Sequence, residues 1–436
     1  MLNRIVPAPQ QWQGTTGTFT LPDTVRVAAD EASNSVADTL GAELVEITGI
    51  SASRSDDSVG SDATVVLSVD AGDPAFRALS DACRAEAYLI RIDDRIELVG
   101  ASRRGLLWAT RSLLQLLTAG EELPRGTVVD WPDYPVRGFL LDVGRRFAHP
   151  AFVRDLIRMM SWFKLNMFVV HLNDNEITKD TGRPWGEAQH GFRLRSENPR
   201  YAPLASPDGA YTRADWESFE ELARRHGSDL VPEIDAPAHA RAFIVADPSL
   251  GLNDGESDLL DLANPAATEF MRDLVDEFVT WFSGPYFHFG ADEYDEQHTE
   301  LYRDYFNTMA QHVRAKGKVP MAWGSLTKME RGAPPTAYDR DVMICCWNND
   351  WYHPGEAIDH GYRIVNCSDD WLYTVPYPTT TTAPDWTDRP CGRAGSRMSS
   401  PADSGSNRVT RRSSALCPRY GMTWYRPTTT NTRSTP

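Results

Sequence analysis

Seven short apolar segments recur along the middle of this chain, and helical patterns separate them. The segments are residues 138–142, 167–172 and 230–234, followed by others near Phe287, Met321, Ile344 and Ile364. They are apolar throughout rather than alternately apolar and polar, which indicates strands covered on both faces, as in a parallel sheet. Regular alternation of strand and helix is typical of α/β proteins. A (β/α)8 barrel of the TIM type fits best, and a doubly wound open sheet is the second interpretation.

The 436-residue chain is too long for one ordinary hydrophobic core, and its pattern changes near residue 131. Residues 1–130 are predicted to form a small α+β domain. Its predicted elements are strands over 64–69, 87–92 and 96–99 and a helix over 104–117. A connector with two prolines, residues 131–135, follows. We therefore assign residues 131–377 to the barrel.

The composition changes again at residue 378. From there to residue 436 the chain has nine Arg and three Asp, no Glu and no Lys, and it is rich in Ser, Thr and Pro. The rest of the chain is strongly acidic. This segment is predicted to be disordered or to be an out-of-frame translation, and no eighth strand is expected in it. The predicted barrel is therefore incomplete at its C-terminal end.

The bulk properties exclude several classes of partner. A net charge of −17 argues against binding to nucleic acid or to an anionic membrane surface. No segment approaches the roughly 18 apolar residues that span a bilayer. The N-terminus has no apolar run typical of a signal peptide, and the six cysteines form no CxxC pair. We expect a cytoplasmic protein with reduced thiols.

Polar and ionisable side chains gather where the apolar segments end. The clearest case is the run from Tyr286 to Glu293, in which an apolar strand leads into two adjacent acids, Asp292 and Glu293. Adjacent carboxylates repel each other, so a stable domain keeps them mainly for a function. The other ends supply Asp142, Arg145, His171, Asp174, Glu233, Asp235, His239, Trp323, Trp347, Trp371 and Tyr373. Carboxylates, an arginine and aromatic rings together predict a sugar-binding site with a carboxylic acid as proton donor.

Several of these segments, in this order, resemble family-20 glycoside hydrolases, the β-N-acetylhexosaminidases. The matching segments are Arg137-Gly138 through Asp142 and Arg145, Lys164-Leu165-Asn166, His171-Leu172-Asn173-Asp174, Pro232-Glu233-Ile234-Asp235 through His239, and His288 through Glu293. The resemblance covers residues 1–377, including the small domain that precedes the barrel. It implies a retaining exo-glycosidase without an enzyme nucleophile, which needs no metal or cofactor and acts on glycans that contain N-acetylhexosamine.

In the mechanism that the resemblance implies, the acetamido oxygen of the substrate attacks the anomeric carbon and forms an oxazolinium intermediate. Glu293 would protonate the leaving oxygen and then activate water. Asp292 would orient the acetamido N–H and stabilise the developing positive charge. The other implied roles are Tyr373 on the acetamido oxygen, Trp323 and Trp347 as pocket walls, Arg145 on sugar hydroxyls, and Asp174 with His239 as a network that supports Glu293. The like charge of Asp292 is expected to raise the pKa of Glu293 and keep its proton.

The chain departs from the family pattern at several positions. Asn175 follows Asp174 where a second acid is usual, and Ala291 stands in place of a glycine. Thr374 follows Tyr373, with no Asp soon after it, and the usual last-strand motif with a Trp and a Glu is missing. These departures resemble a branch of the family that includes lacto-N-biosidases, which release a disaccharide.

Two other interpretations stay open. A barrel hydrolase that uses a metal is one, and its ligands would be His171, Asp174, Asp235, His239, His288 and Asp292. Against it, the first strand lacks the His-x-His that such barrels usually have. The other is an inactive glycan-binding remnant with a broken C-terminus.

Overall fold

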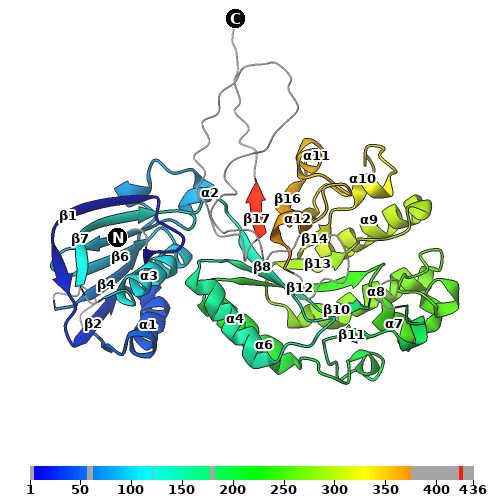
Figure 1. Cartoon of the computed structure of the whole chain (residues 1–436), viewed down its shortest axis with the longest axis horizontal. Helices are drawn as coiled ribbons and strands as arrows, with labels where there is room; N and C mark the ends of the chain where they lie inside the picture. The colour runs from blue at the N-terminus through cyan, green and yellow to red at the C-terminus, as the bar shows by residue number, and fades with distance from the viewer. Residues whose placement is uncertain (1–3, 56–61, 121, 177–181, 375–421, 426–436) are drawn as a thin grey trace, which may run out of the picture.

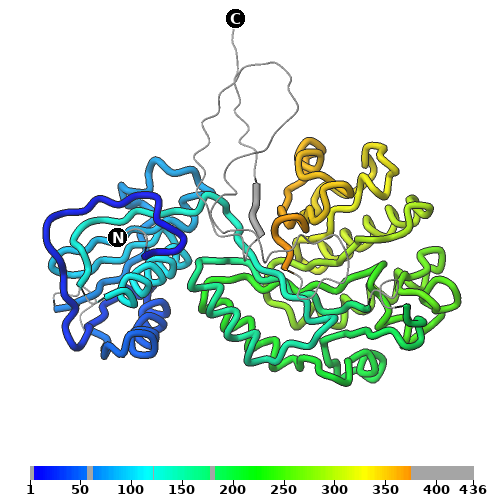
Figure 2. Tube along the Cα trace, viewed as in Figure 1, coloured from blue at the N-terminus to red at the C-terminus, as the bar shows by residue number. Residues whose placement is uncertain are grey.

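The computed structural model describes residues 4–55, 62–120, 122–176, 182–374 and 422–425. These residues form a small N-terminal domain, blue to cyan in Figure 1, and a barrel, green to orange. The Cα trace in Figure 2 shows the two units joined by one connection between β7 and β8. The predicted change of pattern at residue 131 falls in this connection. Of the tail from residue 378 on, only residues 422–425 are described.

The N-terminal domain is built on one mixed sheet of seven described strands. The strands are β1 Gln11–Thr20, β2 Thr24–Ala29, β3 Ser51–Arg54, β4 Val65–Val69, β5 Tyr88–Ile92, β6 Ile96–Gly100 and β7 Glu122–Asp130. Their order in the sheet is β1-β7-β5-β6-β4-β2-β3. Helices α1 Asn34–Glu43 and α3 Arg103–Leu117 share a hydrophobic core with the sheet, and α2 is Asp81–Arg84. The predicted strands and helix are all present, within one residue at each end.

Seven parallel strands form most of a barrel. They are β8 Arg137–Asp142, β9 Met167–His171, β12 Asp229–Ala236, β13 Tyr286–Gly290, β14 Val319–Trp323, β15 Met343–Cys346 and β16 Arg363–Asn366. The strand order is β12-β13-β14-β15-β16-β17-β8-β9, and the barrel is closed. The TIM-type interpretation is therefore confirmed, and the open doubly wound sheet is excluded.

The eighth place in the barrel is filled from the tail. Strand β17, Met422–Tyr425, pairs antiparallel with both β16 and β8. No eighth parallel strand occurs among the described residues, as expected, but the prediction of no strand at all in the tail is wrong for these four residues. An open barrel edge presents unpaired backbone N–H and C=O groups. Met-Thr-Trp-Tyr is rich in residues that favour extended chain, so it can pair there.

Helices and short strands follow the barrel strands. They are α4 Pro150–Trp162, β10 Asn173–Asn175, β11 His190–Phe192, α6 Arg213–Arg225, α7 Arg241–Ala246, α8 Pro265–Phe278, α9 Thr299–Ala315, α10 Leu326–Met329, α11 Pro354–Asp359 and α12 Asp369–Leu372. Outward-facing strand residues such as Phe168 and Phe287 pack in one core with these helices. Inward-facing residues such as Val169, Met321 and Trp323 form a second, smaller core inside the barrel. No helix in the described ranges is long and apolar enough to cross a membrane.

A buried carboxylate, Glu86, joins the N-terminal domain to the barrel. It accepts hydrogen bonds from Trp108 Nε1 at 2.7 Å, Arg137 Nη2 at 2.5 Å and Asn166 Nδ2 at 2.6 Å. Beside it, the Lys164 ammonium lies 2.8 Å from the Tyr88 hydroxyl. Lys164 and Asn166 precede β9, so they lie at the opposite end of that strand from His171. The Lys164-Leu165-Asn166 segment therefore joins the two units and does not build the site.

Candidate active site

One row of paired residues crosses four strands near their C-terminal ends. Asp142 of β8 pairs in register with His171 of β9, His171 with Glu233 of β12, and Glu233 with His288 of β13. Residues paired in this way point to the same side of a parallel sheet. Their side chains therefore converge inside the barrel, at the end where barrel enzymes build their sites.

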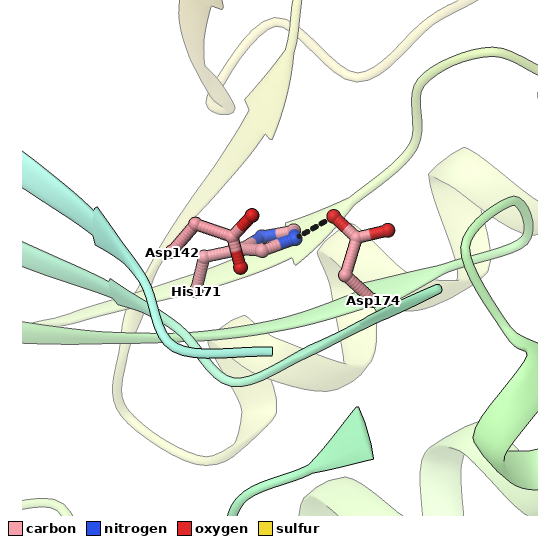
Figure 3. Close-up of side chains that lie close together, drawn as sticks. All are labelled: Asp142, His171 and Asp174. Carbon is pink, nitrogen blue, oxygen red and sulfur yellow. Dashed lines mark hydrogen bonds and ion pairs between the residues drawn. The ribbon is translucent and has the colours of Figure 1, made fainter. Parts of the chain in front are cut away.

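Asp174, just beyond β9, is the centre of the charged groups. Its Oδ2 atom lies 2.7 Å from His171 Nε2 and 2.5 Å from Arg145 Nη1, and its Oδ1 atom lies 2.9 Å from His239 Nδ1. Figure 3 shows the His171 ring turned toward Asp174, with Asp142 beside it. Burial raises the pKa of Asp174, but the charges of His239 and Arg145 outweigh it and hold that pKa well below its usual range. Asp174 is therefore a fixed anion.

The Asp-Glu pair follows β13 in a tight turn. Gly290, Ala291 and Glu293 all have positive φ, of 78°, 68° and 45°. Gly290 is required for space as well, because a Cβ atom there would lie 1.7 Å from Asp235 Oδ1. Ala291, which replaces the family glycine, adopts the left-handed conformation at a cost of about 1 kcal/mol. The turn buries the Asp292 side chain, 12% exposed, and leaves that of Glu293 43% exposed.

His239 connects Asp174 to the acid pair. It has a positive φ of 55°, and its Nε2 atom lies 3.1 Å from Glu293 Oε2 and 3.6 Å from Asp292 Oδ2. Burial lowers the pKa of His239, but Asp174 and Asp292 outweigh burial and raise that pKa well above its usual value. His239 is therefore a cation held between three carboxylates.

The pKa directions of the two acids correct the expectation from sequence. Burial raises the pKa of Glu293, but the hydrogen bond to His239 and the charge of His239 lower it below its ordinary value. The expected rise in the pKa of Glu293 is thus wrong. The pKa of Asp292 is raised to about 6. Burial is the main cause, the charge of Glu293 raises the pKa further, and the charge of His239 lowers it by less than these two effects together. Repulsion between the two carboxylates therefore raises the pKa of Asp292, since this acid is the less hydrated one.

The predicted aromatic residues lie at the later strand ends. Trp323 ends β14, is 5% exposed and donates from Nε1 to Glu233 Oε1 at 2.6 Å. Trp347 is partly buried and packs in the same barrel-interior core as Trp323. Tyr373 follows α12, and burial, with the nearby Cys367 and Asp292, raises its pKa well above the usual value. The structure thus gathers the eight predicted residues at one end of the barrel, while their roles stay predictions.

From the sequence alone, Glu233 and Asp235 have no predicted role in binding the sugar, although Asp235 is a candidate metal ligand. Glu233 is fully buried and contacts both Trp323 and His171. Asp235 is also fully buried, and neither of its carboxylate oxygens has a hydrogen-bond partner among the described residues. Both follow from the alternation of β12, in which residues 233 and 235 point to the same side. The register between strands, which pairs Glu233 with His171 and His288, is the signal that would have shown their neighbours in the site.

Five of the six residues proposed as metal ligands lie close to one another or to Asp142 and Glu233, whereas His288 belongs to none of the sets found among the described residues. Three sets offer ligand atoms within 4.8 Å of one another: Asp142, His171 and Asp174; His171, Glu233 and Asp235; Asp235, His239 and Asp292. In the first set the Arg145 guanidinium already lies 2.5 Å from Asp174, and in the second Trp323 donates to Glu233. In these two sets the contacts favour a network of hydrogen bonds and charges over a metal centre. In the third set, the Asp235 carboxylate has no hydrogen-bond partner among the described residues.

Comparison with known families decides the relationship. Residues 134–388 match the model of the glycosyl hydrolase family 20 catalytic domain, and residues 3–131 match that of domain 2 of the same family. The chain belongs to glycosyl hydrolase family 20. The match to the family-20 catalytic model includes Asp174, His239, Asp292 and Glu293, which follow the barrel strands β9, β12 and β13.

Curated relatives of this family-20 chain are longer than it. A lacto-N-biosidase of Bifidobacterium bifidum is 26% identical over 392 residues, which are 83% of this chain and 32% of the relative. A beta-hexosaminidase of Porphyromonas gingivalis is 25% identical over 414 residues, 85% of this chain and 49% of the relative. The chain thus spans about a third of the first relative and about half of the second.

Solved structures share the fold. A beta-N-acetylhexosaminidase of Bacteroides fragilis superposes with a TM-score of 0.69 at 22% identity, covering 85% of this chain and 76% of the other. An exo beta-N-acetylglucosaminidase of Vibrio harveyi, solved with N-acetylglucosamine, gives a TM-score of 0.67 at 22% identity over 84% of this chain and 60% of the other. At this identity the likeness concerns the fold.

Proposed function

We propose that this family-20 chain is a β-N-acetylhexosaminidase that removes terminal β-linked N-acetylhexosamine with retention of configuration. The observation that carries the proposal is the unequal environment of the acid pair. Asp292 is buried against His239, while Glu293 reaches solvent at the open end of the barrel. The buried Asp292 is thus suited to facing a charge on a bound ligand, and the more exposed Glu293 to exchanging a proton with it.

The proposed reaction uses the amide of the substrate as nucleophile. The acetamido oxygen forms a bond to the anomeric carbon while the bond to the leaving oxygen breaks and that oxygen takes a proton from Glu293. Asp292 accepts the acetamido N–H and stabilises the positive charge of the oxazolinium ion. Glu293, now a carboxylate, removes a proton from water, which attacks the anomeric carbon and restores the acetamido group.

His239 is the proposed source of the proton for the first step. His239 lies 3.1 Å from Glu293 and holds the pKa of Glu293 down. A bound neutral sugar would exclude water from Glu293 and so raise its pKa. We infer that His239 and Glu293 share one proton, which moves to Glu293 when the sugar binds.

Release of a disaccharide is the second candidate. The relative from Bifidobacterium bifidum is named a lacto-N-biosidase, and the match to it extends over 83% of this chain. Analysis of the products from a β-linked N-acetylhexosamine oligosaccharide separates the two candidates. A monosaccharide product supports the hexosaminidase, and a disaccharide product supports the second candidate.

A thiazoline that mimics the cyclised intermediate is expected to inhibit competitively. Transition-state and intermediate analogues bind about 10² to 10⁸ times more tightly than substrates. The Ki of the thiazoline should therefore lie at least about 100-fold below the KM of an aryl N-acetyl-β-glucosaminide. Steady-state kinetics at several inhibitor concentrations measures the ratio. A Ki no lower than the KM would argue for a nucleophile on the enzyme.

A further inference from the structure

Glu233 is a buried carboxylate with contacts on two sides of the site. On one side it accepts the indole N–H of Trp323 at 2.6 Å, a residue proposed as a pocket wall. On the other side its Oε1 atom lies 3.0 Å from His171 Nδ1. The Nδ1 atom of His288 lies 3.5 Å from the same oxygen. With its side chain fully buried, Glu233 meets no solvent and has no access to a sugar.

The His171 contact continues to the proposed acid. His171 Nε2 lies 2.7 Å from Asp174, Asp174 lies 2.9 Å from His239, and His239 lies 3.1 Å from Glu293. Each of these contacts joins groups of opposite charge or a donor and an acceptor. These contacts form a continuous path from Glu233 to the His239 ring that faces Glu293, and Glu233 also contacts the ring of Trp323.

We propose that Glu233 is a positioning residue that couples the acetamido pocket wall to the acid/base group. It fixes the indole of Trp323 on one side and, through His171 and Asp174, the imidazole of His239 on the other. The inference rests on the proposed function, because it assigns Glu233 a part in that reaction.

The charges around Glu233 agree with this role. His171 of β9, His288 of β13 and Trp323 of β14 face it, as does Asp235 from its own strand. Burial raises the pKa of Glu233, but His171 and His288 outweigh it and lower that pKa. Burial lowers the pKa of His171, but Glu233 and Asp174 raise it well above its usual value. The charge of Glu233 also contributes to the raised pKa of Asp292 and of Tyr373. Glu233 and Asp174 thus together keep His171 protonated.

The test compares two leaving groups in the full chain. We expect Glu233→Gln to lower kcat about 100-fold with phenyl N-acetyl-β-glucosaminide, whose leaving group needs a proton. With the 2,4-dinitrophenyl glycoside, which departs without one, the loss should be only about tenfold. The matched control is Trp323→Phe, which breaks only the contact on the wall side and should slow both substrates by the same factor. A loss from Glu233→Gln that is equal for both leaving groups overturns the proposal.

Two further measurements keep the test decisive. If Glu233→Gln does not fold, His171→Gln interrupts the same contact at the next residue and should give the same dependence on leaving group.

If the unchanged protein hydrolyses neither glycoside, the proposed function fails, and NMR then tests the coupling alone. Glu233→Gln should lower the pKa of His171 and shift the indole proton of Trp323, assigned with Trp323→Phe. Unchanged signals from both residues would refute the coupling.

Discussion

Replacing Glu293 by glutamine is expected to lower kcat for phenyl N-acetyl-β-glucosaminide about 10³-fold. Proton transfer by a positioned side chain contributes about 10² to 10⁴ to a rate, and the amide can neither give nor take the proton. Glutamine keeps the shape of the side chain and an oxygen that can accept from His239, 3.1 Å away. The measurement is steady-state hydrolysis, with the 2,4-dinitrophenyl glycoside as a second substrate.

Two controls separate loss of the proton from loss of the fold. The Glu293 side chain is 43% exposed, so the substitution should change the free energy of unfolding by less than about 1 kcal/mol. The first step should also be slowed much less for the dinitrophenyl substrate, because its leaving group departs unprotonated. A variant that keeps the full rate with the phenyl glycoside would show that another residue is the acid.

Replacing Asp292 by asparagine is expected to lower kcat about 10² to 10³-fold for both leaving groups. Removal of one group that stabilises developing charge typically has an effect of this size. Asp292 must be ionised to accept the acetamido N–H and to face the oxazolinium charge. Because its pKa is raised to about 6, the unchanged protein should lose kcat/KM as the pH falls below about 6.

The pH profile of the variant is the sharper measurement. Asparagine does not titrate, so the acidic limb near pH 6 should disappear from the residual activity of Asp292→Asn. Glu293→Gln, measured with the dinitrophenyl substrate, should keep that limb. Should the limb persist in Asp292→Asn, the titrating group is a different one, and His239 and Asp235 are the next to test.

The barrel could be predicted because its strands are buried on both faces. Val169 and Met321 face the interior, while Phe168 and Phe287 face the helices, so the sequence is apolar without alternation. Strand β17 could not be predicted. Its four residues complete the barrel by pairing with β16 and β8, and pairing between segments so far apart leaves no local pattern.

The residues of the site could be predicted from the sequence, but the directions of their pKa shifts could not. Asp292 and Glu293 stand out as adjacent acids, and the repulsion between them is a sound local argument. That argument placed the raised pKa on Glu293, whereas the structure places it on Asp292. The reason is His239, which lies 54 positions earlier in the chain and comes close to both acids only through the fold. The place of Glu233 between Trp323 and His171 likewise depends on strand register.

The most direct test of the account compares two substrates that differ only at the sugar 2-position. One is an aryl N-acetyl-β-glucosaminide, and the other is the β-glucoside with the same leaving group and a plain 2-hydroxyl. If the acetamido group is the nucleophile, kcat/KM should be at least about 10⁴-fold higher for the amide, because an intramolecular nucleophile has an effective concentration of about 10⁵ M or more. Equal values of kcat/KM for the two glycosides would contradict the account.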